Sequence, residues 1–135
     1  MKVSELAMKA CTYTLNVQSS CSPDFIDITE DVEGCIESSG VTQGIVVVFS
    51  KHTTAAVVIQ ENEPLLLEDF RRLLENIASS DAKYRHNDFD VRTVHMHEGE
   101  CPNGHSHCQN LVLGSSETIP LAEGKMTLGE WQRVF

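Results

Sequence analysis

The sequence predicts an α+β fold: a single compact domain with a β-rich mixed sheet and two main helices. Three observations support this fold class. The chain has 135 residues, which is long enough for one hydrophobic core. Most apolar segments are short and separated by glycine or proline, and two longer segments have helical periodicity. We therefore expect residues 1–135 to form one domain, without an internal repeat or a linker.

Two segments are predicted to be helices. Residues 27–40 carry acidic residues in the first turn and end at Gly40, which suits a helix C-terminus. Residues 61–78 have apolar residues at helical spacing. In this second segment Asn62 is the expected cap, and Pro64 is tolerated in the first turn.

The remaining apolar segments are predicted to be strands. They are residues 11–18, 44–50, 55–60, 89–97, 109–116, 117–122, 125–129 and 130–135. Residues 44–50 form a continuous β-branched run, which predicts a strand buried on both faces. Residues 89–97 alternate, so His95 and His97 are expected on one face. The sequence AEGK predicts a hairpin turn.

Composition limits the classes of partner. The formal net charge is −10, so binding to nucleic acid or to an anionic membrane surface is not expected. The sequence contains neither an apolar run typical of a signal peptide nor a spanning segment, which predicts a cytoplasmic protein. Five cysteines are an odd number, and we expect reduced thiols.

Four of the six histidines fall in one segment, HMHEGECPNGHSHC, residues 95–108. His95 and His97 would lie about 6–7 Å apart on a strand, and His105 and His107 repeat the spacing. Four imidazoles brought together in this way can bind a divalent transition metal. Further candidate ligands in the segment are Glu98, Glu100, Cys101 and Cys108. The alternative is a solvent-exposed loop whose histidines have no function.

A second polar cluster lies in KHTTAAVVIQENE, residues 51–63. His52 follows a predicted buried strand, and Glu61 and Asn62 lie where the next strand meets a helix. Such junctions often hold ligands, and helix N-termini bind anions. Taken alone, the cluster favours a simpler interpretation, in which Asn62 only caps the helix and His52 is a surface residue.

The two clusters together resemble a known family. HTTA, ENE before an amphipathic helix, H..EG, PNGHSH and GSSETIPLAEGKMTLGEWQ occur in that order. This pattern is similar to the YjbQ-like family, which is largely uncharacterised and is also called the secondary thiamine-phosphate synthase family. The resemblance spans nearly the whole chain. It implies a homotrimer and a polar pocket, at the subunit interface, where the family's histidines converge.

The resemblance also implies site residues. The family's histidines correspond to His52, His95 and His107, which are the expected metal ligands. A divalent metal is the expected cofactor, with Zn²⁺ favoured and Mg²⁺ an alternative for a diphosphate substrate. If protonated, the same three imidazoles would instead bind a phosphate or sulfate anion.

Further family positions imply catalytic and binding residues. Glu61, Glu98 and Asn103 are the expected catalytic residues, with either glutamate as the acid–base partner. Ser115 and Ser116 of the GSS segment are expected to bind the cofactor. Second-rank candidates for the ligand set are His86, His97, His105, Cys101 and Cys108.

Two functions are compatible with these residues. The resemblance implies an enzyme that joins a pyrimidine diphosphate to a thiazole phosphate, releasing pyrophosphate and forming thiamine phosphate. The family name marks this activity as secondary, so the substrate stays open beyond a phosphorylated small molecule. The alternative is a non-catalytic trimeric module that binds a metal ion or an anion. The sequence lacks P-loop, GxGxxG and GxSxG motifs, which argues against the corresponding enzyme classes.

The C-terminus departs from the family pattern. The resemblance implies a further strand after the WQ pair, whereas this sequence stops at EWQRVF. Either the protein is naturally short or the sequence lacks a tail. If that strand is absent, we expect a neighbouring subunit or loop to cover the open sheet edge.

Overall fold

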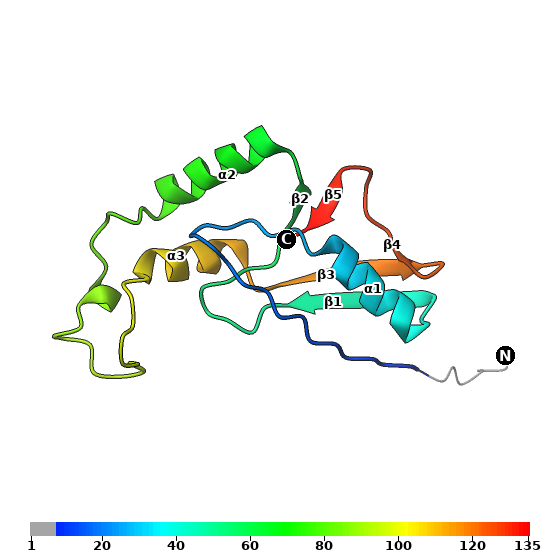
Figure 1. Ribbon diagram of the computed structural model, residues 1–135, viewed down its shortest axis with the longest axis horizontal. Coiled ribbons are helices and arrows are strands. Elements are labelled where there is room, and N and C mark those ends of the chain that lie inside the picture. Colours follow the sequence, from blue (N-terminus) through cyan, green and yellow to red (C-terminus); the bar gives the residue numbers. More distant parts are fainter. Residues whose placement is uncertain (1–7) are drawn as a thin grey trace, which may run out of the picture.

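The computed structural model describes residues 8–135 (Figure 1). Its helices are α1 (Thr29–Ser39), α2 (Pro64–Ile77) and α3 (Gly104–Leu113), with a short 3-10 helix, η1 (Arg85–Asn87). Its strands are β1 (Gln43–Phe49), β2 (Ile59–Glu61), β3 (Ser116–Ala122), β4 (Lys125–Met126) and β5 (Gln132–Val134). The fold is α+β, as predicted, and forms a single compact domain.

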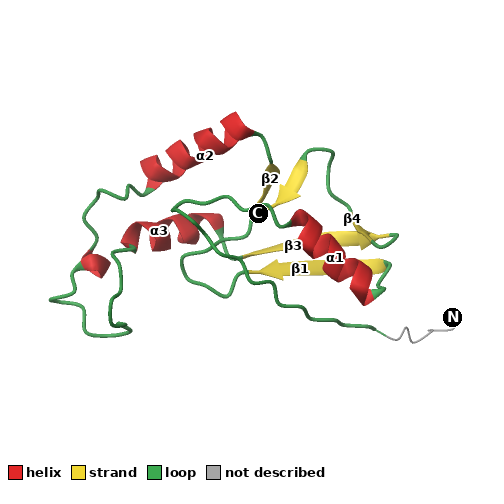
Figure 2. Ribbon diagram, viewed as in Figure 1, coloured by secondary structure: helices red, strands yellow, loops and turns green. Residues whose placement is uncertain are grey.

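Two small sheets form the β structure (Figure 2). β1 pairs with β3 along its whole length, from Gln43 opposite Ala122 to Phe49 opposite Ser116, and β4 follows β3 across a tight turn. β2 pairs with β5 in the second sheet. Within residues 8–135 every strand pairing is antiparallel, so the sheets are not of the mixed type that was expected. α1 crosses the first sheet, whereas α2, α3 and η1 lie toward one end of the molecule.

The core lies between α1 and the two sheets. Its buried members are Val32, Ile36, Val57, Ile119, Leu121, Met126 and Val134. Val32 and Ile36 are one helical turn apart on α1, and Ile119 and Leu121 alternate along β3. Val134 is fully buried and joins the second sheet to this core. The periodicity of the sequence therefore accounts for the buried face of α1 and of β3.

One face of β1 is exposed. Ile45, Val47 and Phe49 are 67%, 56% and 61% exposed, whereas Val46 and Val48 on the other face pack against the core. The prediction of a strand buried on both faces is therefore wrong for the single chain. A continuous apolar run shows that both faces are apolar, but it does not show that the same chain covers both of them.

The helix termini follow local signals, with one correction. α1 ends at Gly40 in the left-handed conformation (φ 64°), as predicted. α2 is capped by Glu63, not by Asn62: the Glu63 carboxylate accepts from the backbone N–H groups of Leu65 (3.0 Å) and Leu66 (2.7 Å). Asn62 lies one residue before the N-cap position, and its side-chain NH2 group donates to Asp27 (2.9 Å).

Three strand predictions are wrong. Residues 11–18 have the alternating pattern but are not part of a strand in the structure. Residues 89–97 form a turn-rich loop, in which His95 has a positive φ of 51°. Residues 109–113 belong to α3, whose apolar run LVL has the composition of a strand. A short apolar run does not distinguish a strand from a buried helix, and a strand needs a partner that periodicity alone does not reveal.

Three other segments pair over less of their length than predicted. The strand predicted for 55–60 is found at Ile59–Glu61, that for 125–129 at Lys125–Met126, and that for 130–135 at Gln132–Val134. Among residues 8–135, no helix is both long enough and apolar enough to cross a membrane.

Candidate functional site

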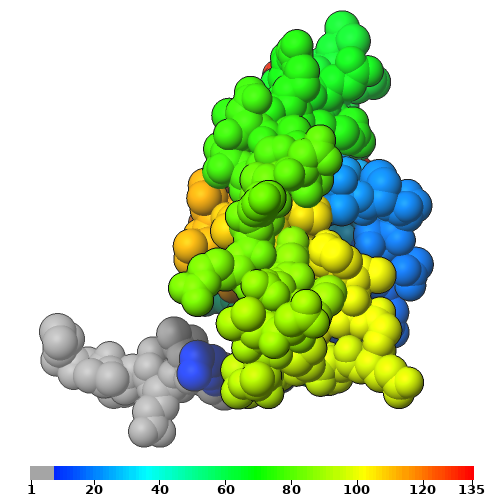
Figure 3. All heavy atoms as spheres, turned by 90° about the vertical axis from the view of Figure 1, so that its left-hand side faces the viewer, coloured from blue at the N-terminus to red at the C-terminus, as the bar shows by residue number. Residues whose placement is uncertain are grey.

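The rings of His86 and His107 are in contact. Their centroids are 4.5 Å apart and their planes meet at 68°, an edge-to-face arrangement. His86 lies on η1 and His107 on α3, and these two helices pack against each other. Figure 3 shows this end of the molecule, where residues 80–105 (yellow-green to yellow) lie below α2. The contact brings together two segments about twenty residues apart.

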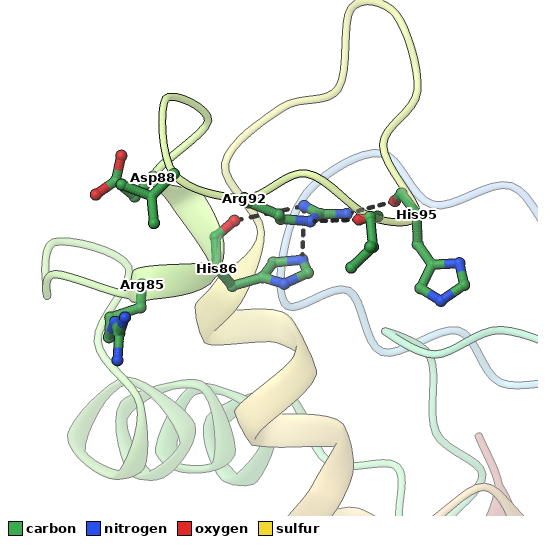
Figure 4. A pocket seen from close by; sticks show the side chains of 7 residues that line it. Arg85, His86, Asp88, Arg92 and His95 are labelled. Atoms are coloured by element: carbon green, nitrogen blue, oxygen red, sulfur yellow. Dashed lines mark hydrogen bonds between the residues drawn. The ribbon is translucent and has the colours of Figure 1, made fainter.

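Arg92 links His86 to the loop before α3 (Figure 4). One terminal nitrogen of Arg92 lies 3.2 Å from His86 Nε2 and 2.5 Å from a carboxylate oxygen of Glu100, and the other lies 2.5 Å from the carbonyl of His95. A guanidinium group has donors only, so Nε2 of His86 must accept. In this contact the ring proton of His86 lies on Nδ1.

Arg92 and Glu100 form a half-buried ion pair. Their side chains are 12% and 14% exposed, and both carboxylate oxygens of Glu100 accept from the guanidinium. Hydrogen bonds from Arg92 lower the pKa of Glu100, which keeps the carboxylate ionised. Glu100, rather than Glu98, is thus the acidic residue at this site, and Glu98 is exposed in the same loop.

The pKa of His107 is lowered from its ordinary value. Burial is the largest cause, followed by the positive charges of His86 and Arg92; Glu100 raises the pKa, and His52 lowers it further. His107 is therefore neutral at pH 7. His52, in a different loop, is the smallest of these causes.

His52 is held by its own loop. Its Nδ1 lies 3.2 Å from the backbone nitrogen of Thr54 and 2.9 Å from the Thr54 hydroxyl. Thr54 therefore orients the His52 ring. Nδ1 accepts from the backbone N–H group, so Nε2 of the neutral ring carries the proton.

His95 lies at the rim of the cluster. It lines, with Arg85, His86, Asp88, Val91, Arg92 and Val94, an open hollow of about 510 Å³. The backbone carbonyl of His95 accepts from Arg92, but its ring is exposed and points away from the guanidinium (Figure 4). The predicted pairing of His95 with His97 on a strand face is wrong because this segment is a loop.

Glu61 lies in a different hollow, of about 390 Å³. This hollow is lined by Asp27, Glu61, Asn62, Glu63, Glu130, Trp131 and Arg133. Glu61 ends β2 and pairs with Gln132 of β5. The structure therefore separates Glu61 from the histidine cluster, with which the sequence had grouped it. Trp131 is 65% exposed here and is not part of the core.

Asn103 precedes α3, and its side-chain oxygen is buried without a hydrogen-bond partner. His107 lies one turn further along α3, and its backbone N–H donates to the Asn103 carbonyl (3.2 Å). Ser115 and Ser116 lie at the start of β3, where the Ser115 carbonyl accepts from Ser50 at the end of β1 (2.8 Å). Neither serine is among the residues that line the hollow beside His86.

The donor set does not fit a zinc ion in this arrangement. A catalytic zinc site takes about three protein ligands. Across residues 8–135 no group of three or more His, Cys, Asp or Glu side chains is arranged to hold an ion. Both oxygens of Glu100 are engaged by Arg92, and a guanidinium beside His86 opposes a second cation.

A family model described as "UPF0047 protein YjbQ-like" matches residues 13–135. The chain belongs to this family. A UPF0047 protein of Methanothermobacter thermautotrophicus is 41% identical over 128 residues, which is 95% of this chain and 82% of that protein. A UPF0047 protein of Archaeoglobus fulgidus is 35% identical, over 90% of this chain and 85% of that protein.

Solved structures of the YjbQ-like family have the same fold. An uncharacterised conserved family protein of Clostridium acetobutylicum has a TM-score of 0.74 at 32% identity, covering 87% of this chain and 82% of that chain. A protein of unknown function from Sulfolobus solfataricus, described as YbjQ-like, has a TM-score of 0.70 at 34% identity, covering 82% of this chain and 72% of that chain. The predicted family membership and fold class are confirmed.

Arg92 was not among the residues predicted from the sequence. Its position could have indicated a role, because it is the single lysine or arginine between His86 and Cys108. A lone cation within a segment rich in histidine and carboxylates is a candidate for an internal ion pair. His86 was only a second-rank candidate, yet it is the imidazole that contacts His107.

Proposed function

We propose that this YjbQ-like protein is an enzyme acting on phosphorylated small molecules, and that His86, His107 and Arg92 bind the phosphate group. One observation carries the proposal: the rings of His86 and His107, from two segments, meet beside the guanidinium of Arg92, whose side chain is 12% exposed. Imidazolium and guanidinium groups are phosphate-binding groups. To bind a phosphate, Arg92 would exchange hydrogen bonds that it now donates to Glu100 and to the His95 carbonyl for phosphate oxygens. The convergence of these groups favours a phosphate over a cation.

The cluster is close to neutral without a ligand, which makes phosphate binding dependent on pH. Arg92 is compensated by Glu100, and the lowered pKa of His107 keeps its imidazole uncharged at pH 7. A bound dianion would favour the protonated form of His107 and raise its pKa. Binding would therefore take up a proton, and affinity should increase as the pH falls toward 6.

A neutral His107 beside a bound phosphorylated substrate also suits acid–base chemistry. An imidazole that is unprotonated at pH 7 can accept a proton from a reacting group, and a second imidazole next to it can donate one. Formation of thiamine phosphate, implied by the family resemblance, stays a prediction. Roles for Glu61, Glu98 and Asn103 as catalytic residues, and for Ser115 and Ser116 in cofactor binding, also stay predictions.

Turnover of phosphorylated small molecules tests the proposal. Purified protein would be screened for release of phosphate or pyrophosphate, beside His107→Ala and the control His97→Ala. His97 is exposed in the loop before α3, and within residues 8–135 its ring makes no hydrogen bond. We expect His107→Ala to reduce turnover by about 100-fold or more and His97→Ala to retain it. Equal activity of His107→Ala and wild type would overturn the assigned role.

Binding of Zn²⁺ or another divalent metal by His52, His95 and His107 also stays a prediction. It would require the exposed ring of His95 to turn toward the other two. Elemental analysis of tag-free protein, beside His52→Ala and His107→Ala, distinguishes the two proposals. About one ion per chain, lost in both variants, would favour the metal; no ion in any sample would favour the anion.

A homotrimer is the proposed assembly, and the exposed apolar face of β1 supports it. Ile45, Val47 and Phe49 form a row that a second copy of the chain would cover. Sedimentation equilibrium measures the mass of the assembly directly. A cytoplasmic location stays a prediction as well.

A further inference from the structure

We propose that Asn87 is a positioning residue that holds the ring of His86 against His107 by capping α3 from outside the helix. Asn87 is the last residue of η1 and directly follows His86. Its side-chain oxygen accepts from the backbone N–H groups of Asn103 (3.1 Å) and Gly104 (2.9 Å). These two bonds join the segment that carries His86 to the N-terminus of the helix that carries His107.

The cap is needed because α3 does not cap itself. Asn103 occupies the N-cap position, but its side chain makes no capping hydrogen bond. The first N–H groups of a helix lack partners within the helix, and an acceptor from elsewhere in the chain satisfies them equally well. A backbone N–H only donates, so the atom of Asn87 that meets both of them is its carbonyl oxygen. The amide of Asn87 is therefore oriented unambiguously.

Gly104 permits the close approach that this cap requires. A Cβ atom added at Gly104 would lie 2.6 Å from Cβ and 2.7 Å from Cγ of Tyr84, and 3.1 Å from the Asn87 side-chain oxygen. Distances below 3.0 Å are not tolerated, so a larger residue would push η1 away from α3. Gly104 is not in the left-handed conformation, and its role here is steric.

The hydrogen bonds of Asn87 lie close to the contact between the His86 and His107 rings, one residue away along η1 and one turn away along α3. His86 adjoins Asn87, and His107 lies three residues beyond Gly104. Arg92 fixes the other side of His86 through its ring nitrogen (3.2 Å) and its carbonyl (3.4 Å). Without the Asn87 cap, η1 keeps its link to Arg92 but loses its hydrogen bonds to α3. The ring of His86 would then separate from His107.

The geometric part of this inference does not depend on the function, whereas its effect on binding rests on the function proposed above. The test is NMR of histidine-labelled protein, with the ring signals assigned by single His→Gln variants. The readouts are the nuclear Overhauser effect between the His86 and His107 rings and the pKa of His107. The matched control is Glu63→Ala, which removes the cap of α2 and leaves the cluster untouched.

In Asn87→Ala we expect the nuclear Overhauser effect between the His86 and His107 rings to be lost. We also expect the pKa of His107 to rise toward the ordinary histidine value. Asn87→Asp keeps the acceptor and should retain the contact. Glu63→Ala should retain both readouts. Phosphate affinity should fall about fivefold in Asn87→Ala, which is the scale of a lost helix cap.

Two results would overturn the inference. One is an unchanged ring contact and His107 pKa in Asn87→Ala; the other is the same loss in Glu63→Ala, which would show only general destabilisation. If Asn87→Ala does not fold, Gly104→Ala serves instead and should weaken the same contact; an unchanged contact there would count against the inference. Wild-type protein that shows the ring contact but binds no phosphate would contradict the proposed function and leave the positioning result intact.

Discussion

Replacement of Asp27 by Asn should remove a pH-dependent part of the stability. Asp27 precedes α1 and accepts from Arg133 (2.7 Å), from Asn62 (2.9 Å) and from the backbone and hydroxyl of Thr29 (3.0 and 2.6 Å). Partial burial raises the pKa of Asp27, but these hydrogen bonds outweigh it and hold the pKa at about 2. The network ties the start of α1 to β5 and to the end of β2.

The pKa shift gives the size of the effect. The pKa falls from 3.8 to about 2, and each unit is worth about 1.4 kcal/mol, so the ionised carboxylate contributes at most about 2.5 kcal/mol. Because the folded-state pKa is the lower one, this contribution is complete above about pH 4. It is lost as the pH falls through about 2.

Urea denaturation of wild type and Asp27→Asn, between pH 7 and pH 2, measures this contribution as a difference. We expect the variant to be about 2 kcal/mol less stable at pH 7, with the difference shrinking below about pH 4. Glu30→Gln is the control, because Glu30 bonds to the same arginine but is largely exposed, so its effect should be smaller. A difference that stays constant with pH would refute the reasoning.

Two further predictions concern the core and the cluster. Val134→Ala should destabilise the protein by about 2 kcal/mol in the same denaturation assay, because Val134 is fully buried between the two sheets; a loss below about 0.5 kcal/mol would contradict that packing. Glu100→Gln should lower the pKa of His107 still further, because Glu100 is the neighbouring charge that raises it. NMR titration measures this pKa, and an upward shift would show that Arg92 and Glu100 are arranged differently.

Local signals in the sequence predict the elements whose structure is decided locally. α1 and α2 have helical periodicity, and Gly40 marks the end of α1. The strand over 117–122 was also predicted, and it extends by one residue to form β3. α3 was missed because the segment before it is rich in glycine and proline and its apolar run LVL resembles a strand.

The candidate site was only partly predictable. Motif positions singled out His107, and the structure shows its ring in contact with another imidazole. The contribution of His86 and Arg92 depends on how η1 packs on α3, which no local pattern encodes. Glu61 lies at a strand end as expected, but the pairing of β2 with β5 places it in another hollow. Tertiary contacts therefore decide which polar residues meet.

Titration with sulfate at pH 6 and pH 8, followed by NMR of the His107 ring, tests the central claim most directly. The charge of sulfate does not change in this range, so any pH dependence belongs to the protein. We predict saturable binding that shifts the His107 signal and is tighter at pH 6, by up to about tenfold per pH unit for one proton taken up. His107→Ala should abolish this binding and His97→Ala should retain it. Binding that is absent at both pH values, or unchanged in His107→Ala, would contradict the account of an anion site at His86, His107 and Arg92.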